Sequence, residues 1–496
     1  MSSELGDRLP DLAVDPSSPS PRARQPWLAG VAAVNALAAW GGAVALATAG
    51  TDFGERTNDR LPFDSLVLAG LALATMVAIP LTVLAWSAWT GAARTDGVAL
   101  VVGLMLMGWI VVQAVILRAF SLFQPAYLGI GAYFVAASKK VRLGPRRRGI
   151  FLVCVGAVLV AAGIGLLPHL IKNGLTIMSA VSVVLLLSGL ASLVQGARLA
   201  LRDRRRLSKL VGGVAVVLFV AVAVSIIAPA VAATRVPASD VSSTPASLGL
   251  SYQSLTLTTT DGVKLAAWYV QGKNGAGIVV MHGAGSTRSD VLGQSAVLAR
   301  NGYTVVLIDA RGHGDSQGTA MDFGWYGDLD IAAGTEFLAS SADIDPGRIG
   351  VVGFSMGGEE AIGAAATDPR IHAVVAEGAT GRQAGDKEWF SAAYGLRGWI
   401  QERLEYVQYG VTDFLTDASP PISLRSAVAN APNTRFLLIT AGNVADEGGA
   451  ASYIQSGASG RVTVWKVDGA GHTLGYDTRP AEWQQHVVEF LHESLS

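Results

Sequence analysis

Long apolar segments fill most of the first half of the chain, and they restrict its fold more than any other feature. Between residues 27 and 233 the runs are each roughly 15–25 residues long, the length that crosses a bilayer as a helix. The segments lie at 28–49, 65–87, 98–117, 122–138, 150–168, 175–197 and 210–232. Soluble helices with so few charges would leave too little polar surface. We therefore predict an all-α transmembrane bundle of about seven helices over 27–233.

The fourth segment, 122–138, is the short one, and Arg118, Gln124 and Pro125 crowd its start. It either spans the membrane by itself or forms a re-entrant hairpin with the third segment. The composition of the whole chain agrees with a membrane protein, since 51% of its residues are hydrophobic and only 15% are charged.

The loops between the segments alternate in charge, which predicts their sidedness. One set is strongly basic and is expected in the cytoplasm, because short basic loops resist export. Its members are Arg22, Arg24, Arg94, Lys139, Lys140, Arg142, Arg146, Arg147, Arg148, Arg198, Arg202, Arg204, Arg205, Arg206 and Lys209. The N-terminus is then cytoplasmic and the C-terminal half lies outside, which predicts a multi-pass protein of the plasma membrane.

Ionisable residues inside the segments would suggest transport, but they are scarce here. Arg118, His169 and Lys172 fall at predicted helix ends. We therefore interpret the bundle as an anchor in the lipid bilayer rather than as a transporter.

The chain changes character around its middle. Residues 1–26 are rich in Ser, Pro, Asp and Arg and are predicted to be a disordered tail, and 234–249 form a polar linker. From 250 to 496 a β-hairpin is followed by apolar strands that alternate with amphipathic helices. This alternation predicts an α/β domain with a mostly parallel, doubly wound sheet. The expected parallel strands are 277–281, 304–308, 349–352, 373–376, 436–439 and 462–467.

One strand of this domain runs into a sharp turn with a serine at its apex. The strand 349–352 continues into Gly353-Phe-Ser355-Met-Gly357, and an Ala-rich helix follows. Side chains two residues before and after the serine would collide in such a turn, so both positions are glycine. The turn raises the hydroxyl of Ser355 above the sheet edge, which favours a nucleophile.

This strand, turn and helix resemble those of the α/β-hydrolase superfamily, and the resemblance covers about the last half of the chain. It implies a catalytic acid and a histidine that follow the serine in the sequence. His472 lies after the last strand and before the final helix, so it is the expected base. The expected acid is Asp446, in the loop after 436–439, with Glu447 and Glu377 as alternatives. The family usually places its acid three residues after the glycine that ends this strand, and here that position holds Ala445.

The resemblance also implies an oxyanion hole made of two backbone amides. Met356 supplies one directly after the nucleophile. Ala284 supplies the other, from the loop His282-Gly-Ala-Gly285. His282 is expected to brace this loop rather than to react. In a further loop of the superfamily type, Asp309 and Arg311 are expected to tie the turn together.

An insertion at about 380–432 is predicted to be a small helical lid. Its aromatic residues either line an apolar substrate pocket or form the lid's own core. They are Trp389, Phe390, Tyr394, Trp399 and Tyr406.

Taken together, these features predict a membrane-anchored, extracytoplasmic serine hydrolase of the esterase, lipase, peptidase or dienelactone-hydrolase-like type. It would cleave a small-molecule, lipid or peptide ester or amide through an acyl-enzyme. The lone Cys154 and the spacing of the histidines indicate no metal site, no cofactor is implied, and the net charge of −1 does not favour nucleic acid. The alternative is a catalytically silent binding or sensor module coupled to a membrane transport or signalling domain. The substrate, the leaving group and the oligomeric state stay open at this point.

Overall fold

The structure is a computed structural model that describes residues 24–48, 65–117, 123–138, 144–237, 239–318, 321–416 and 418–496. The chain divides into two compact units. The first contains Met1–Leu117, Tyr127–Leu152 and Val194–Arg202, and the second contains Arg118–Ala126, Val153–Leu193 and Asp203–Ser496. The second unit therefore holds parts of the apolar helices together with the whole sheet domain.

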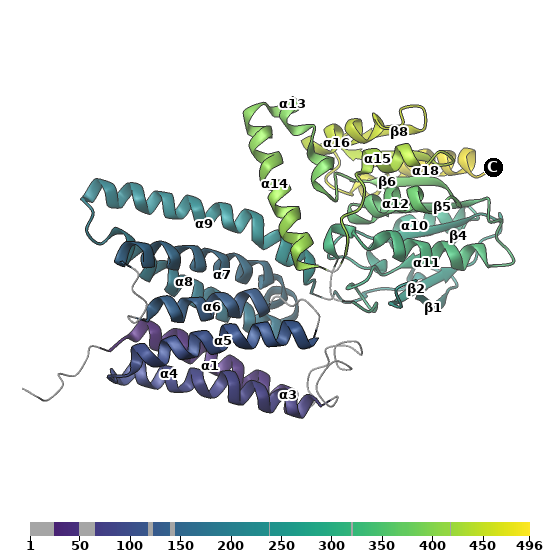
Figure 1. The fold of residues 1–496 in the computed structure, drawn as a ribbon. Coiled ribbons are helices and arrows are strands. Elements are labelled where there is room, and N and C mark those ends of the chain that lie inside the picture. Colours follow the sequence, from purple (N-terminus) through teal and green to yellow (C-terminus); the bar gives the residue numbers. More distant parts are fainter. Residues whose placement is uncertain are drawn as a thin grey trace, which may run out of the picture. The chain divides into compact units, whose positions relative to one another are not determined.

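The apolar half is helical, as its sequence predicts (Figure 1). Six of its described helices are long and apolar enough to cross a membrane, when 66–90 is counted as one. The elements are α1 (Pro26–Ala47), α3 (Leu66–Leu73), the π-turn η2 (Ala74–Ala78), α4 (Ile79–Thr90), α5 (Thr95–Leu117), α6 (Phe123–Ala137), α7 (Pro145–Asn173), α8 (Ile177–Leu201) and α9 (Arg206–Thr234). The predicted segment 122–138 corresponds to α6, which has only 15 residues. The six long helices fit a membrane domain.

Small residues mark the closest contacts between these helices. In the first unit, a Cβ added to Gly103 of α5 would lie 2.6 Å from the carbonyl oxygen of Gly131 in α6. In the second unit, a Cβ on Gly156 of α7 would lie 2.8 Å from the carbonyl oxygen of Gly189 in α8. Such approaches require glycine, and they let helix backbones pack tightly without large side chains between them.

The sheet domain has eight strands in the order β1-β2-β4-β3-β5-β6-β7-β8. The strands are β1 (Gln253–Thr258), β2 (Lys264–Val270), β3 (Gly277–Met281), β4 (Thr304–Ile308), β5 (Ile349–Phe354), β6 (Ile371–Glu377), β7 (Arg435–Ala441) and β8 (Val462–Val467). β1 and β2 form the antiparallel hairpin, β2 also pairs antiparallel with β4, and the pairings from β4 to β8 are parallel. This confirms the predicted fold class.

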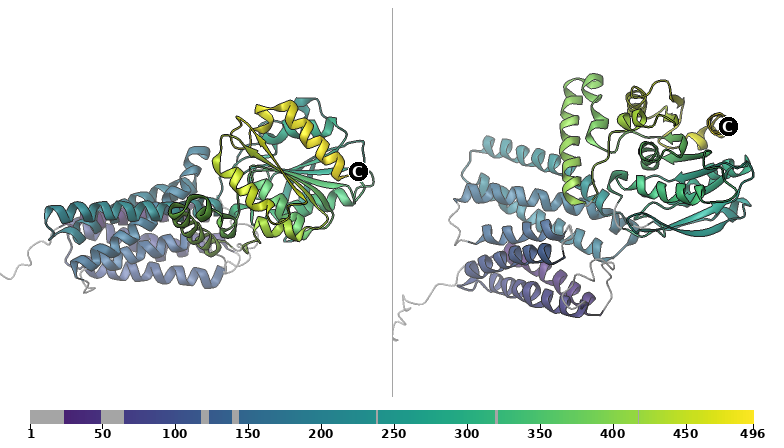
Figure 2. Two further views of the ribbon diagram at one scale, coloured as in Figure 1. Left: turned by 90° about the horizontal axis from the view of Figure 1, so that it is seen from above. Right: turned by 45° about the vertical axis from the view of Figure 1, so that its right-hand side comes forward.

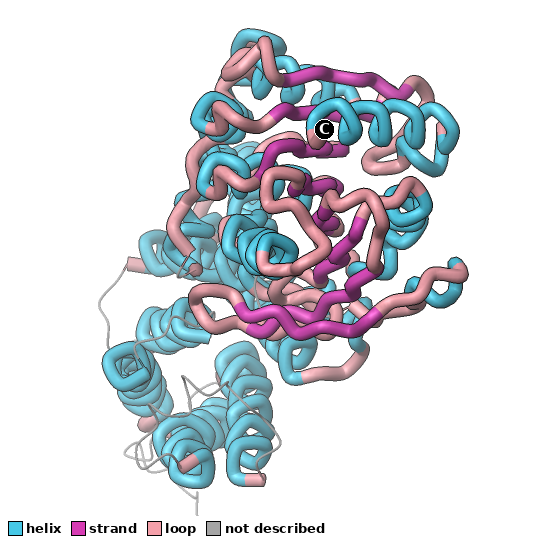
Figure 3. Tube along the Cα trace, turned by 90° about the vertical axis from the view of Figure 1, so that its right-hand side faces the viewer, coloured by secondary structure: helices cyan, strands magenta, loops and turns pink. Residues whose placement is uncertain are grey.

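Helices cover both faces of the sheet, as Figures 2 and 3 show. Core residues of α10 and α18 pack on one face, and those of α11, α12, α15 and α16 pack on the other. The helices are α10 (Leu292–Arg300), α11 (Gly327–Ala339), α12 (Met356–Thr367), α13 (Phe390–Tyr394), α14 (Leu396–Leu415), α15 (Leu424–Asn430), α16 (Ala445–Gln455), α17 (Gly475–Thr478) and α18 (Pro480–Ser494), with short 3₁₀ turns η3 (Pro245–Leu248), η4 (Arg288–Val291), η5 (Asp322–Gly324) and η6 (Ala384–Lys387). Parallel pairing brings the carboxyl ends of β3, β5, β6 and β7 to one edge of the sheet.

The predicted lid consists mainly of α13 and the longer α14. Its aromatic residues divide between two environments, and neither sequence-based alternative describes all of them. Phe390 is buried against Trp389, with the two ring centroids 4.6 Å apart. Trp399 and Tyr406 on α14 are exposed, and Tyr406 lines a cleft of about 890 Å³ together with polar residues such as Glu402 and Arg403.

Candidate active site

Ser355 lies at the sharp turn between β5 and α12. Its backbone has φ 52° and ψ −118°, a conformation that non-glycine residues rarely adopt. The turn is held by the amide of Ser355, which donates to the carbonyl oxygen of Glu377 at 2.7 Å. A Cβ on Gly353 would lie 2.1 Å from the carbonyl oxygen of Gly357, so a larger residue at this position would open the turn. The local strain thus fixes the serine hydroxyl at the sheet edge.

His472 faces this hydroxyl from the loop after β8. Its Nε2 lies 2.8 Å from Oγ of Ser355, and its Nδ1 lies 2.7 Å from Oε1 of Glu447. With the proton on Nδ1, the ring donates to the carboxylate, and Nε2 can accept the proton of the serine. The three groups form the hydrogen-bond chain that a serine nucleophile requires.

The carboxylate in this chain is that of Glu447, which the sequence predicted as an alternative to Asp446. Asp446 accepts a hydrogen bond of 2.6 Å from the hydroxyl of Tyr394 in the lid. The Glu447 side chain is only 1% exposed, and its second oxygen accepts from the amide of Ala441 at 2.6 Å. The alternative carboxylate, rather than the favoured one, lies beside the histidine.

The reason is that the acid lies on a helix and not on an extended loop. α16 begins at Ala445, so Asp446 and Glu447 both belong to its first turn. Successive residues of a helix point about 100° apart, because a turn holds about 3.6 residues. When Glu447 faces the sheet edge, Asp446 must therefore face away from it. Counting residues from the end of the strand could not show where this helix begins.

The third candidate, Glu377, has a different position at the end of β6. Its carboxylate accepts from the amide of Gly475 at 2.7 Å and from Nε1 of Trp483 at 2.9 Å. These bonds join the end of β6 to the loop that carries His472 and to α18. Glu377 is thus brought near the site without touching the imidazole, and it positions the histidine loop.

The electrostatics of the site suit a histidine base. The hydrogen bond that His472 donates to Glu447 raises the pKa of His472, and this effect outweighs the half-burial of the ring, which acts in the opposite direction. Burial raises the pKa of Glu377. A buried carboxylate beside Nδ1 stabilises the imidazolium that forms when the serine gives up its proton.

The loop after β3 lies directly beside Ser355. A Cβ on Gly283 would lie 3.3 Å from Cβ of Ser355, so only glycine allows this close approach without a shift. Within the described residues, no hydrogen bond is donated by the amides of Met356 and Ala284, the two predicted oxyanion donors. Both amides therefore remain available to a ligand.

Two buried histidines hold this loop in place. Nε2 of His282 accepts from the amide of Ala310, and Nε2 of His313 accepts from the amide of Gly285, both at 3.0 Å. Burial lowers the pKa of each ring to about 4, so both are neutral and can accept. His282 therefore has the bracing position that the sequence predicts. Lys172, at the end of α7 in the same unit, adds a bond of 2.9 Å to the carbonyl oxygen of Gly285.

Charged pairs tie the neighbouring loop together. Arg311 donates to Asp330 at 2.7 Å and to Asp261 at 2.8 Å. Asp309 accepts from the guanidinium and the amide of Arg288. These pairs account for the Asp-Ala-Arg sequence as a structural tie.

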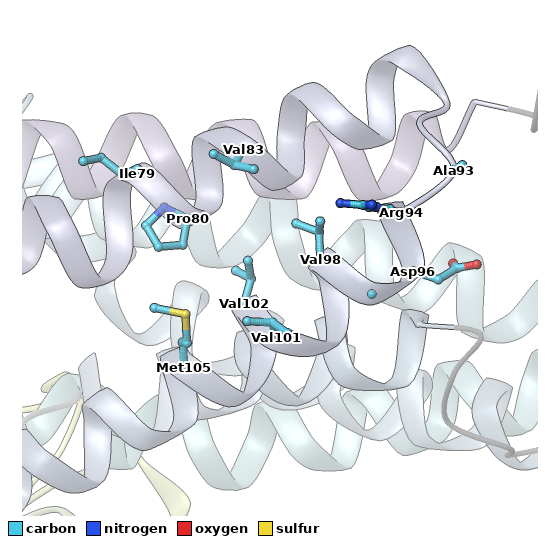
Figure 4. Close-up of a pocket in the computed structure, with 11 residues that line it drawn as sticks. Ile79, Pro80, Val83, Ala93, Arg94, Asp96, Val98, Val101, Val102 and Met105 are labelled. Atoms are coloured by element: carbon cyan, nitrogen blue, oxygen red, sulfur yellow. The ribbon is translucent and has the colours of Figure 1, made fainter.

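A separate cavity of about 780 Å³ lies in the first unit between α4 and α5 (Figure 4). Its lining is mainly apolar, with Arg94 and Asp96 near one end. None of the residues predicted for catalysis lines it.

Comparisons with known proteins agree with the sheet topology. A family model described as the alpha/beta hydrolase family matches residues 278–484. This match and the sheet topology support an α/β-hydrolase fold for the C-terminal part of the chain.

The curated relatives share short regions with the chain. An uncharacterized protein of Mycobacterium tuberculosis is 33% identical over 114 residues, which are 22% of this chain and 40% of that protein. A thiohydrolase of Aspergillus aculeatus is 32% identical over 134 residues, 25% of this chain and 41% of that protein. An uncharacterized membrane protein of Saccharomyces cerevisiae is 29% identical over 121 residues, 24% of this chain and 42% of that protein. The chain spans about two fifths of the length of these relatives.

Among solved structures, an esterase of Pyrococcus furiosus is 24% identical to the chain, with a TM-score of 0.41. The match covers 52% of this chain and 99% of the esterase.

Proposed function

We propose that the protein is a membrane-anchored serine hydrolase that cleaves an ester or amide through an acyl-enzyme on Ser355. The observation that carries the proposal is the hydrogen-bond chain from Ser355 through His472 to Glu447. In the first step His472 takes the proton of Ser355 while Oγ attacks the acyl carbon. His472 then gives that proton to the leaving group, and a water molecule, activated in the same way, releases the acid.

The oxyanion of the tetrahedral intermediate would be held by the amides of Met356 and Ala284. Met356 begins α12, so the positive end of that helix supports the same charge. The position of Gly283 against Ser355 supports this assignment, because it brings the second loop within reach of the reacting carbon.

The alternative, a silent binding module, rested on the unusual position of the acid. Glu447 lies beside His472, where it is buried and accepts two hydrogen bonds. This geometry supports an active hydrolase over a silent module. The name of the Aspergillus aculeatus relative adds thioesters to the acyl compounds worth testing.

We further propose that the active site works outside the cytoplasm. The support is the charge of the loops, since Arg146–Arg148, Arg198 and Arg204–Arg206 all precede the last apolar helix or lie near its start. The single helix α9 then carries the chain across the membrane to the hydrolase. A C-terminal alkaline phosphatase fusion should be active, whereas an active cytoplasmic reporter at the same point would contradict the topology.

The activity is tested with a fluorophosphonate probe on membranes that contain the full-length protein. The wild type should be labelled at its own mass, and Ser355→Ala should lose labelling and about 10⁶-fold in kcat for a short-chain ester. The unfolding temperature of the variant serves as the control and should match that of the wild type. Retention of the wild-type rate by the alanine variant would place the active site elsewhere.

A further inference from the structure

The lid helix α14 exposes its apolar side, whereas an ordinary surface helix exposes its polar side. Its outward side carries large apolar side chains that are exposed, among them Leu396 at 74% and Tyr406 at 68%. Trp399, Ile400 and Val407 lie on the same stripe, at spacings of three, four and seven residues. A helix on a water-facing surface would place these residues inward.

The inward side of α14 carries several polar groups beside the ring of Tyr409, and specific hydrogen bonds hold it. Glu402 accepts from the amide of Ser391 at 2.7 Å, and the hydroxyl of Tyr409 donates to the carbonyl oxygen of Gly381 at 3.2 Å. Thr412 on this side is buried. These contacts fix the rotation of the helix, so the apolar stripe cannot turn inward without breaking them.

The stripe is close to a surface of the same kind in the same unit. α14 contacts α9 and lies across its C-terminal end (Figure 1). On α9 the large apolar residues, such as Val217 and Leu218, are themselves exposed, as expected for a helix that faces lipid. Near the junction, the amide of Met321 donates to the carbonyl oxygen of Ala233. α14 thus contacts the buried end of a helix whose preceding turns are apolar and exposed.

The residue types on the outward side are those of a membrane interface. Trp399 and Tyr406 have amphipathic rings of the kind enriched at the level of lipid headgroups. Two arginines flank them and rest on aromatic rings: Arg403 over Trp399 at 5.6 Å and Arg397 over Tyr394 at 5.7 Å. Such cations can lie along apolar surface and keep their charge among anionic headgroups.

We propose that the outward side of α14 docks into the headgroup and acyl boundary of the bilayer, on the hydrolase side of the membrane. The occupant of this surface is lipid. An interfacial helix of this type buries its apolar side about 5–10 Å below the surface. The lid would then be held by the membrane and not only by the hydrolase.

This docking gives the proposed hydrolase a route to acyl substrates dissolved in the bilayer, and that part of the inference rests on the proposed function. The lid is joined to the acid-bearing helix α16. Tyr394 donates to Asp446, and a Cβ on Gly449 would lie 2.3 Å from the ring of Trp389. A lid fixed at the membrane interface would therefore lie next to the helix that carries Glu447. Its position would affect how acyl substrates reach the candidate active site.

The docking is tested by spin labelling of the full-length protein in vesicles of phosphatidylcholine and phosphatidylglycerol. In a Cys154→Ser background, one nitroxide is attached at Ile400→Cys, Val407→Cys or Gln485→Cys. Gln485 lies exposed on α18 and is the matched control. We expect the labels at 400 and 407 to be accessible to oxygen and shielded from a water-soluble nickel complex, and the label at 485 to show the reverse.

Two outcomes would overturn the docking. Accessibility of all three labels to the nickel complex would show that α14 faces water. Protection of the labels at 400 and 407 from both reagents would show that a protein, such as a second copy of the chain, covers the stripe. Neither outcome depends on catalysis, so failure of Ser355 to react with the probe would leave this measurement valid.

The substrate route is tested separately with the double variant Ile400→Glu/Val407→Glu. Its hydrolysis of a long-chain ester carried in vesicles should fall by about tenfold or more, because two charges oppose burial of the stripe. Its hydrolysis of a soluble acetyl ester and its probe labelling should stay near the wild-type level. Equal rates on the vesicle-borne ester in both proteins would reject the route through the bilayer.

Discussion

The strands of the sheet domain and the apolar helix α9 differ in how far they bury their large apolar residues. In β3, β4 and β5 every residue is buried, and most of them are large and apolar. In α9, by contrast, large residues such as Leu218 and Val217 are more than half exposed, while Gly156 and Gly189 of α7 and α8 lie in close backbone contact. Hydrophobicity therefore predicts burial in these strands but not along α9, and small residues mark where α7 and α8 approach each other.

Polar groups differ between the two regions as well. Buried serines of the helical half bond to carbonyl oxygens of the helices, as Ser192 does to Ser188 at 2.9 Å. In the hydrolase, buried Glu447 bonds across elements to His472 and to the amide of Ala441. The hydroxyl of Ser192 is satisfied within its own helix, whereas Glu447 holds a site together.

The two regions should differ most in the loss of kcat when Glu447 and Ser192 are each replaced. Glu447→Gln should lower kcat by about 10⁴-fold, the cost of a conservative amide replacement at the triad acid of a serine protease. Asp446→Asn should lower it by less than about tenfold, since it weakens one exposed hydrogen bond to Tyr394. Ser192→Ala should leave the rate unchanged. Rates on a soluble ester decide the order, and a greater loss at Asp446 would reverse the assignment of the acid.

The pH profile of these variants gives a second test of the same pair. His472 must be neutral to act as a base, and Glu447 raises its pKa. Replacing the carboxylate lowers that pKa, so the acid limb of the residual activity of Glu447→Gln should move to lower pH. Asp446→Asn should keep the wild-type limb, and an equal shift in both variants would contradict the pairing.

A smaller effect is expected from truncating large apolar residues in the two regions. Leu307→Ala in β4 should destabilise the hydrolase by about 2–5 kcal/mol, because Leu307 is fully buried in the sheet core. Leu218→Ala in α9 should change stability by less than about 0.5 kcal/mol. Thermal unfolding in detergent checks both, and equal losses would show that Leu218 is covered by protein.

Adding a methyl group at a glycine should change stability differently at a tight helix contact and on an open helix surface. Gly156→Ala forces a Cβ to within 2.8 Å of the carbonyl oxygen of Gly189, and overpacking of this kind costs about 1–3 kcal/mol. Gly213→Ala in α9 meets nothing within 4 Å and should stabilise the helix by up to about 1 kcal/mol. The unfolding temperatures of both variants in the same detergent measure these changes in stability. A loss at Gly213 would imply a contact at that position.

Much of the fold and part of the candidate site could be predicted from the sequence. Length and hydropathy predict the apolar helices, and alternation of strands with helices predicts the sheet, because both depend on local periodicity. The glycines at 353 and 357 mark the turn of Ser355, and the last strand marks His472. The choice of Glu447 over Asp446 depends on where α16 starts, and that start is set by tertiary packing.

The lid illustrates a second limit. Its aromatic residues suggest a pocket or a core, since large apolar residues usually lie inside soluble domains. α14 instead follows the pattern of the membrane helices, with Trp399 and Tyr406 outward and Thr412 inward. Which side of an amphipathic helix faces the protein cannot be read from its periodicity alone.

The smallest effect concerns a hydrogen bond that joins an apolar helix to the candidate site within the second unit. Nζ of Lys172 at the end of α7 donates to the carbonyl oxygen of Gly285 and to Oγ of Ser239, at 2.9 and 3.1 Å. Gly285 follows Ala284, so this bond helps to fix the loop that would supply an oxyanion donor. Lys172→Met should therefore lower kcat about 3–10-fold, the size of one exposed hydrogen bond, with little change in KM.

Two control variants separate positioning of the loop from a general effect of charge. Lys172→Arg retains a donor and should recover most of the rate. Lys209→Met removes a cation near the start of α9 and should leave kcat unchanged. Because an oxyanion donor acts on the transition state more than on the bound substrate, a misplaced loop affects kcat before KM. A rise in KM alone, or equal losses for Lys172→Met and Lys209→Met, would show that the bond does not position the oxyanion loop.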